Sequence, residues 1–179
     1  MKEIINKYLT EIVSNEINSL PSEIEPEMAE KNANKNEEWK KWFPIPSTVK
    51  DFELTEFEKD IGYKLPESYK QFLKTTHFYE LYINECSFCS HPINIWRSKL
   101  MEMIFNGYPS KYLIETGRIP FANWSDWGLL CFDTTIKCEN NNYPVVLWDH
   151  EMLDRFEYKY SDFNCMLSQL ALEHEKEKE

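Results

Sequence analysis

The sequence has 179 residues and a formal net charge of −11 at pH 7, from 31 acidic and 20 basic side chains. Its length fits one domain, and hydrophobic residues at 42% with aromatic residues at 15% are typical of a folded protein rather than a disordered one. The acidic balance disfavours binding to nucleic acid phosphates and favours association with a basic partner, although acidity also serves solubility alone.

Nothing in the sequence predicts export or membrane insertion. No run approaches the ~18 apolar residues of a membrane helix. The first residues, MKEIINKYLTEIV, alternate charged and apolar side chains and lack the uninterrupted apolar core of a signal peptide. Five cysteines without an export signal indicate free thiols. We therefore expect a cytoplasmic protein.

Residues 1–46 are predicted to be a helical extension followed by a polar linker. Apolar residues recur at helical spacing from Ile4 to Ile17, and Pro21 closes this helix. The stretch 21–41 is rich in Glu, Asn and Lys, which is typical of a linker or a marginal surface helix. Whether the extension docks on the main domain through its apolar face remains open at this point.

The most informative run is FEKDIGYKLPESYKQFL, residues 57–73, which predicts two short helices in succession. Gly62 can adopt the left-handed conformation that ends a helix, and Pro66 fits the first position of the next. Apolar faces at helical spacing come from Leu54, Phe57 and Ile61 in the first helix and from Tyr69, Phe72 and Leu73 in the second.

The middle of the chain predicts a strand, a loop and a helix. The strand is expected at 78–83, and the loop 84–92 contains three potential metal ligands, Cys86, Cys89 and His91. Helical spacing of apolar residues predicts a helix over 96–105.

The second half has the pattern of an antiparallel sheet. Strands are predicted at 119–122, 128–132, 144–148 and 156–160, and the Asn-rich turn 137–142 favours an antiparallel pair. Pro120 suggests an edge strand or a strand start. Ser161 is the expected N-cap of a last helix with its apolar stripe between Phe163 and Leu170, and a charged tail, 173–179, should fray.

Several separated motifs resemble the SMI1/KNR4 (SUKH) superfamily. In the two-helix run the resemblance rests on Glu58, Gly62, Leu65-Pro66, Tyr69 and Phe72-Leu73, and in the second half on residues 119–122, 128–133 and 144–151 and on the last helix. It covers roughly 47–172, which we take as the domain. It implies structural roles for Glu58, Gly62, Leu65, Pro66, Tyr69, Phe72, Pro120, Gly128 and Trp148.

This chain departs from the family pattern at two places. Thr76-His77 stands where members often carry Asn-Gly, and Asn123 to Gly128 replaces a glycine-rich turn. The departures put the identity of the partner in question more than the fold.

The resemblance implies an α+β fold, with a mixed, largely antiparallel sheet and helices packed against it. Bacterial members are mostly immunity proteins of polymorphic toxin systems, so it also implies that the chain neutralises a cognate toxin, such as a nuclease, by occlusion. The expected partner is a protein with a basic surface, without nucleic acid, membrane or cofactor; self-association is left undetermined.

Aromatic residues beside carboxylates are typical of a surface that grips a basic partner. The candidates for such contacts are Trp124, Asp126, Trp127, Asp133, Asp149 and Glu151. Trp124 and Trp127 are placed in a polar turn, with a core role as the alternative, whereas Trp148 lies inside an apolar run and is assigned to the core. If Trp124 anchors the partner, Trp124→Ala should weaken the complex by about 2 kcal/mol or more.

Two other classes of function are weighed against this one. Cys86 and Cys89 with His91 resemble half of a zinc site and are a weak candidate, because a closed site needs four ligands and the sequence has no second CxxC pair. A redox role would need a Cys at the start of a helix, which the pattern does not predict. A regulatory scaffold, as in fungal relatives, would be expected to have long disordered arms. No nucleophile motif or phosphate-binding glycine loop is recognisable, so an enzyme is not expected.

Overall fold

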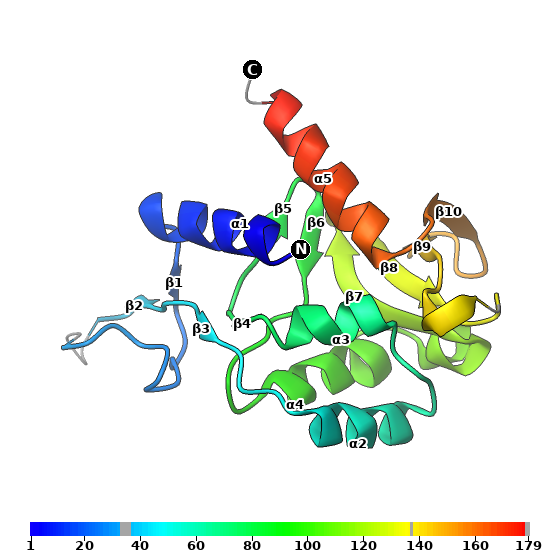
Figure 1. Ribbon diagram of the computed structural model, residues 1–179, viewed down its shortest axis with the longest axis horizontal. Coiled ribbons are helices and arrows are strands. Elements are labelled where there is room, and N and C mark those ends of the chain that lie inside the picture. The colour runs from blue at the N-terminus through cyan, green and yellow to red at the C-terminus, as the bar shows by residue number, and fades with distance from the viewer. Residues whose placement is uncertain (33–36, 137, 178–179) are drawn as a thin grey trace.

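A computed structural model describes residues 1–32, 37–136 and 138–177, and its centre is a six-stranded antiparallel sheet (Figure 1). The strands lie in the order β10-β9-β8-β7-β6-β5, so each pairs with its neighbour in the sequence. Their bounds are β5 Tyr82–Ile83, β6 Cys86–Phe88, β7 Arg118–Trp124, β8 Gly128–Asp133, β9 Val145–Asp149 and β10 Phe156–Tyr160. The predicted α+β class is confirmed.

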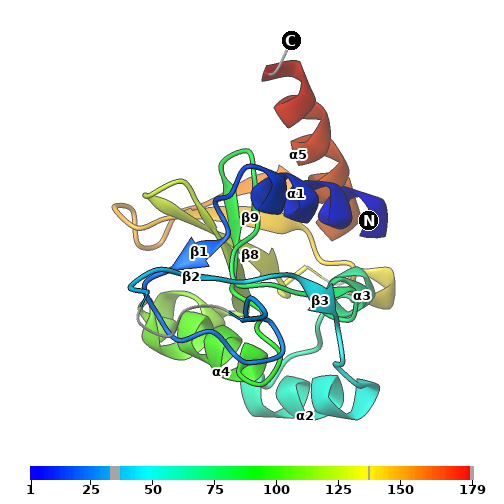
Figure 2. The same cartoon turned by 90° about the vertical axis from the view of Figure 1, so that its left-hand side faces the viewer.

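The helices are placed at two ends of the molecule (Figures 1 and 2). At one end lie α2 (Asp51–Ile61), α3 (Glu67–Leu73) and α4 (Trp96–Met101), which continues as a π-helical turn over Glu102–Asn106. At the other end α1 (Lys2–Ser14) packs against α5 (Phe163–Glu177), which begins in the middle of the molecule, where its first residue contacts Tyr69 and Phe72 of α3. Single 3₁₀ turns occur at Ser110–Tyr112, Ile114–Thr116 and Glu139–Asn141. None of the helices in the described ranges is both long and apolar enough to cross a membrane.

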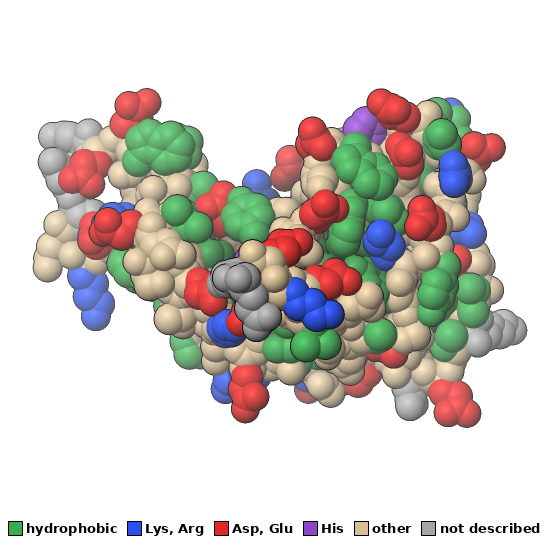
Figure 3. All heavy atoms as spheres, turned by 90° about the horizontal axis from the view of Figure 1, so that it is seen from above, with side chains coloured by type: hydrophobic (Ala, Val, Ile, Leu, Met, Phe, Trp, Pro, Cys, Tyr) green, Lys and Arg blue, Asp and Glu red, His purple; other side chains and the backbone are tan. Residues whose placement is uncertain are grey.

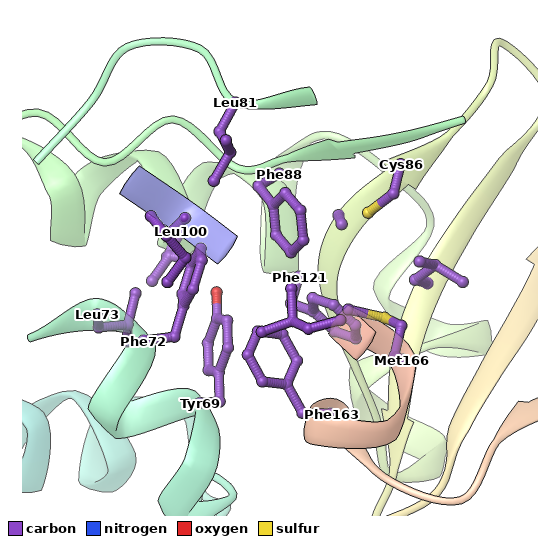
Figure 4. Close-up of a cluster of buried hydrophobic side chains, with 14 of the residues drawn as sticks. Tyr69, Phe72, Leu73, Leu81, Cys86, Phe88, Leu100, Phe121, Phe163 and Met166 are labelled. Carbon is purple, nitrogen blue, oxygen red and sulfur yellow. The ribbon is translucent and has the colours of Figure 1, made fainter. Parts of the chain in front are cut away.

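Both faces of the central strands are covered. Successive side chains of a strand point to opposite faces: on β9, Val145 and Leu147 join the main core, whereas Val146 and Trp148 join a smaller cluster with Leu113 on the other face. The centre of the main core is aromatic (Figure 4), with ring centroids 4.1–6.3 Å apart. It is formed by Tyr69, Phe72, Phe88, Phe121, Phe132 and Phe163.

The two-helix run folds as predicted, with a one-residue shift at its second start. Gly62 ends α2 in the left-handed conformation, at φ 78°, and the predicted apolar faces of both helices are buried. Pro66 is the N-cap of α3 rather than its first helical residue, since its ψ of 139° is extended. The buried Glu58 carboxylate accepts hydrogen bonds from the Leu65 N–H at 3.0 Å and from Lys64 Nζ at 2.6 Å. It therefore joins the end of α2 to the start of the next segment.

Two strand predictions are corrected by the sheet. The stretch 78–83 is mostly irregular and contributes only β5, while Cys86, predicted in a loop, lies in β6. Pro120 is not on an edge strand, because β7 pairs with both β6 and β8. The β7–β8 register shifts between Pro120 and Ala122, and a bulge of this kind accommodates a residue that has no N–H to donate.

The N-terminal segment is part of the core. Short strands pair β1 (Ser19–Leu20) with β2 (Lys40–Lys41), and β3 (Ile45–Pro46) with β4 (Thr76–His77). Met28 and Trp42 are both 0% exposed, and they belong to the same hydrophobic cluster as the helices of the main domain. The described residues of 21–41 therefore form neither a surface helix nor a solvated linker, and residues 33–36 lie outside the described ranges.

The last helix begins one residue later than predicted and does not end early. The Asp162 carboxylate accepts a hydrogen bond from the Cys165 N–H at 2.9 Å, so Asp162 caps α5 and Ser161 does not. The helix continues to Glu177, which corrects the expected fraying from residue 173; residues 178–179 lie outside the described ranges. The predicted antiparallel β8–β9 pair is present, although Lys137 of its connecting turn is not described.

Candidate protein-binding site

Four of the six predicted partner contacts lie together at one end of the sheet. The β7–β8 turn ends at the Trp124–Gly128 pair, and Gly128 is paired in turn with Asp149 on β9. The two neighbouring turns are joined by a hydrogen bond from the His150 N–H to the Trp127 carbonyl, at 3.3 Å. We call this region the tip: residues 125–127 and 149–157. Asp126, Trp127, Asp149 and Glu151 all belong to it.

Asp133 does not belong to the tip. Asp133 ends β8 opposite Arg118, whereas the tip adjoins Gly128 at the start of the same strand, so Asp133 lies about 17 Å from the tip along the strand. Its Oδ1 accepts hydrogen bonds from the Thr135 N–H at 3.0 Å and the Thr135 hydroxyl at 2.5 Å, and lies 3.6 Å from Arg118 Nε. Asp133 is buried, and these contacts make it a turn-forming residue.

Trp124 directly precedes the tip in the sequence and is buried. It is the last residue of β7 and only 6% exposed, so its predicted place in a polar turn is wrong. Lys159 Nζ, from β10, lies 4.7 Å from the centroid of its ring, within the range of a cation–π contact. Its role as a partner contact stays a prediction, but most of its surface is already in contact with this protein.

Trp127 is exposed in the way that a docking residue requires. Its relative exposure is 38%, and Met152 and Leu153 of the neighbouring turn are 47% and 40% exposed. A hollow of about 130 Å³ lies beside it, lined by Trp127, Leu147, Asp149, Arg155 and Glu157. The tip therefore combines exposed apolar surface with carboxylates.

The tip is strongly acidic. Its residues include one arginine, Arg155, and five carboxylates: Asp126, Asp149, Glu151, Asp154 and Glu157. Within the described part of the chain, none of the five has a Lys, Arg or His nitrogen within 4.0 Å. Acidic side chains are also spread among hydrophobic ones over the face shown in Figure 3.

A larger hollow near α4 has a different electrostatic character. It has a volume of about 490 Å³ and is lined by Asp60, Arg97 and Glu102, among others. Arg97 forms an ion pair with Asp60, and Lys99 Nζ lies 3.4 Å from Glu102. Its charges are therefore compensated within the protein, unlike those of the tip.

Leu147, Arg155 and Glu157 were not among the predicted contacts. The pairing predicted for 128–132 and 144–148 does not reach them. The signal that could have found them is the short connection between the predicted strands 144–148 and 156–160, which favours a second hairpin. The antiparallel pairing of β8 with β9 places the C-terminal ends of these two strands at opposite ends of the pair, which separates Asp133 from Asp149. Trp148 is confirmed in the core at 1% exposure, with its indole N–H donating to the Leu153 carbonyl at 2.9 Å.

The weak metal candidates are used elsewhere in the fold. His91 Nε2 lies 2.8 Å from the Leu73 carbonyl, and its ring stacks on His77 with centroids 4.7 Å apart. Cys86 is buried in β6. No three or more His, Cys, Asp or Glu side chains gather as a metal-binding group in the ranges that the structure describes.

The buried thiols are poorly suited to nucleophilic chemistry. All five cysteines are free. Burial raises the pKa of Cys89 to about 12 and raises the pKa values of Cys86 and Cys131 well above the ordinary range. At neutral pH these three residues are therefore thiols and not the reactive thiolates.

Comparison with known families agrees with this architecture. The model of a SUKH family, SUKH_6, described as SMI1-KNR4 cell-wall, matches residues 51–165, from the start of α2 to the first turn of α5. The match spans more than half of the chain, and the chain therefore belongs to the SMI1/KNR4 (SUKH) superfamily. No curated protein matches the sequence.

Proposed function

We propose that the protein is an immunity protein of a bacterial polymorphic toxin system, which binds one cognate protein toxin and neutralises it by occlusion. The observation that carries the proposal is membership of a superfamily whose bacterial members are mostly immunity proteins. An inhibitor of this kind needs a surface and no catalytic residues of its own, which is consistent with the raised pKa values of the buried thiols.

The charge of the chain supports a basic partner. A net charge of −11 attracts a positively charged protein over a distance of about 10 Å at moderate ionic strength and raises its association rate. Toxins that cut nucleic acids have basic clefts, because they hold phosphates. An acidic inhibitor placed over such a cleft excludes the substrate without any chemical step.

The proposal is tested by capture and by protection. Tagged protein is used to capture partners from its native lysate over a series from about 0.1 to 1 M NaCl. We expect one dominant partner with a C-terminal toxin domain, which kills cells when expressed alone and not when this protein is co-expressed. A partner that is not toxic, or a toxin against which co-expression gives no protection, contradicts the proposal.

A further inference from the structure

We propose that the hollow at the tip is a binding pocket for the end of an Arg or Lys side chain presented by a basic protein partner. The inference deepens the proposed function, on which it rests for the protein nature of the partner, by naming where and through which chemistry this partner docks.

The size of the hollow limits what can enter it. Pockets for small-molecule ligands have volumes of about 300–1,000 Å³, whereas this one has about 130 Å³ and lies open to the surface between the two turns. A volume of this size accommodates the end of one side chain. The exposed Trp127, Met152 and Leu153 around it supply the apolar contact area that a docked protein would cover.

The walls of the hollow select for a cation. Leu147 faces the main core side of β9, and the alternation of side chains along the strand places Asp149 on the same side. Glu157 is directly opposite Leu147 on β10, and Asp149, Glu157 and Trp127 line one space. Carboxylates bind guanidinium and ammonium groups by charge-assisted hydrogen bonds, and an indole face attracts the same cations.

Among the residues that line the hollow, Arg155 carries the positive charge, and its side chain contacts Met152 and not the two carboxylates. Arg155 Nη1 lies 3.3 Å from the Met152 sulfur and forms no ion pair with Asp149 or Glu157 in the described structure. Asp149 uses one oxygen to accept the Glu151 N–H at 2.8 Å, which fixes the turn and the direction of the carboxylate. Asp149 is therefore positioned before binding, and neither Asp149 nor Glu157 has an ionic partner within the described residues.

The neighbouring Trp124 shows the same kind of contact already made within the chain. Lys159, which is on the same strand as Glu157, places its Nζ 4.7 Å from the centroid of the Trp124 ring. At the tip the protein thus holds one cation on one tryptophan and leaves a second, more exposed tryptophan with carboxylates beside it. The partner supplies the cation at this second tryptophan.

The experiment follows amide and indole signals by ¹⁵N–¹H NMR while a short arginine peptide, acetyl-Gly-Arg-Gly-Arg-Gly-amide, is added to the full chain. A peptide with Glu in place of Arg is the control ligand. We expect saturable shifts at the Trp127 indole and at the amides of Asp149 and Glu157, with the arginine peptide alone. Two results would overturn the inference: shifts of similar size over the whole acidic surface, or shifts of the same size with the glutamate peptide.

Matched variants locate the binding. Asp149→Asn keeps an oxygen for the Glu151 N–H and Glu157→Gln keeps the shape of the side chain, so the double variant should fold and bind the arginine peptide about fivefold more weakly. Glu27→Gln/Glu38→Gln removes the same charge from two exposed N-terminal positions and should bind as the original does. Equal affinity in both double variants contradicts the assignment.

The aromatic wall has its own comparison. Trp127→Phe retains a ring for the cation and should keep most of the binding, whereas Trp127→Ala should lose it; equal binding by both contradicts a role for the indole. None of these titrations involves a toxin. If the peptide does not bind at the tip, the protection assay still decides whether the protein confers immunity. If the protection assay fails, the peptide-binding result still stands.

Discussion

Glu58 shows how a single buried charge can be structural. The residue is 5% exposed, and its carboxylate accepts hydrogen bonds from the Leu65 N–H and from Lys64, with Lys70 Nζ 3.7 Å away. These contacts connect the end of α2 to the start of α3 at the point where Gly62 reverses the chain. The resemblance to the family assigned Glu58 a structural role, and the structure shows the contacts that such a role requires.

Glu58→Ala should lower the free energy of unfolding by about 2–3 kcal/mol, because it leaves the buried Leu65 N–H without an acceptor. Glu58→Gln should have a smaller effect, since an amide oxygen can still accept that hydrogen bond. Urea denaturation measures both. Glu56→Ala is the control: Glu56 is exposed and 3.6 Å from Arg97, so its loss should change stability by less than about 0.5 kcal/mol. A loss at Glu58 no larger than the one at Glu56 contradicts the assignment.

The stacked histidines His77 and His91 are both held in the neutral form. The Thr48 N–H donates to His77 Nε2 at 2.9 Å, so His77 Nδ1 carries the hydrogen, 3.1 Å from the His91 carbonyl. His91 Nε2 donates in turn to the Leu73 carbonyl. Burial lowers both pKa values, that of His91 to about 3 with help from the neighbouring His77.

Stability should therefore fall on acidification. Above pH ~6.5 both histidines are neutral in the folded and unfolded states; below it the unfolded chain takes up protons that folded His91 does not bind until about pH 3. This histidine alone should lower the free energy of unfolding by about 1.4 kcal/mol per pH unit between these limits. Urea titrations at several pH values measure the slope.

The variant His91→Gln keeps a donor for the Leu73 carbonyl and should reduce that slope. His150→Gln, at an exposed position of the tip, is the matched control and should leave it unchanged. An unchanged slope in His91→Gln would contradict the account of this pair.

At the scale of the element, α5 depends on the residue just before it. The Asp162 carboxylate accepts a hydrogen bond from the Cys165 N–H and places a negative charge at the helix N-terminus, whereas the Ser161 hydroxyl donates to the Asp162 carboxylate at 3.3 Å. Asp162→Ala should therefore destabilise the protein by about 1 kcal/mol and Ser161→Ala by less than about 0.5 kcal/mol. Thermal denaturation of both variants checks this, and the reverse order would restore Ser161 as the cap.

Helices and strands could be predicted where the spacing of apolar residues, glycine and proline determines them. They were harder to predict where the pairing of two strands determines the structure. Gly62, the apolar face of α3 and the stripe of α5 follow from spacing alone. Pro120 does not, because a proline in the interior of a sheet needs a bulge, and a bulge is a property of two strands. Cys86 likewise became a strand residue through its pairing with Trp124 on β7.

At the scale of the whole molecule, the candidate site was predicted in kind but not in extent. Aromatic residues beside carboxylates do meet at the tip, but sequence proximity could not show that Trp124 faces inward while Trp127 faces solvent. That distinction depends on the length of β7, which extends to Trp124 where the sequence predicted an end at residue 122. Glu157 joins the site only because β10 folds back along β9.

For most of the N-terminal 46 residues the sequence pattern could not predict where they pack, and these residues also precede the span that matches the family. Asn18 Nδ2 donates to the Trp42 carbonyl at 2.6 Å, and the Trp42 N–H donates to the Asn18 carbonyl at 2.9 Å. The Trp42 ring is 6.0 Å from that of Tyr79 in the main domain. These contacts give the segment a fixed place in the fold.

Two tryptophans of this segment provide the test. Trp42 is 0% and Trp39 is 56% exposed, although only two residues separate them. Trp42→Ala should lower the free energy of unfolding by about 3–5 kcal/mol, because it leaves a cavity in the shared core, and Trp39→Ala should change it by less than about 0.5 kcal/mol. If chemical denaturation shows both changes to be small, the segment is a loosely attached arm. If only Trp42→Ala is strongly destabilised, and the whole chain of that variant still unfolds in a single transition, the folded unit extends well beyond residues 51–165.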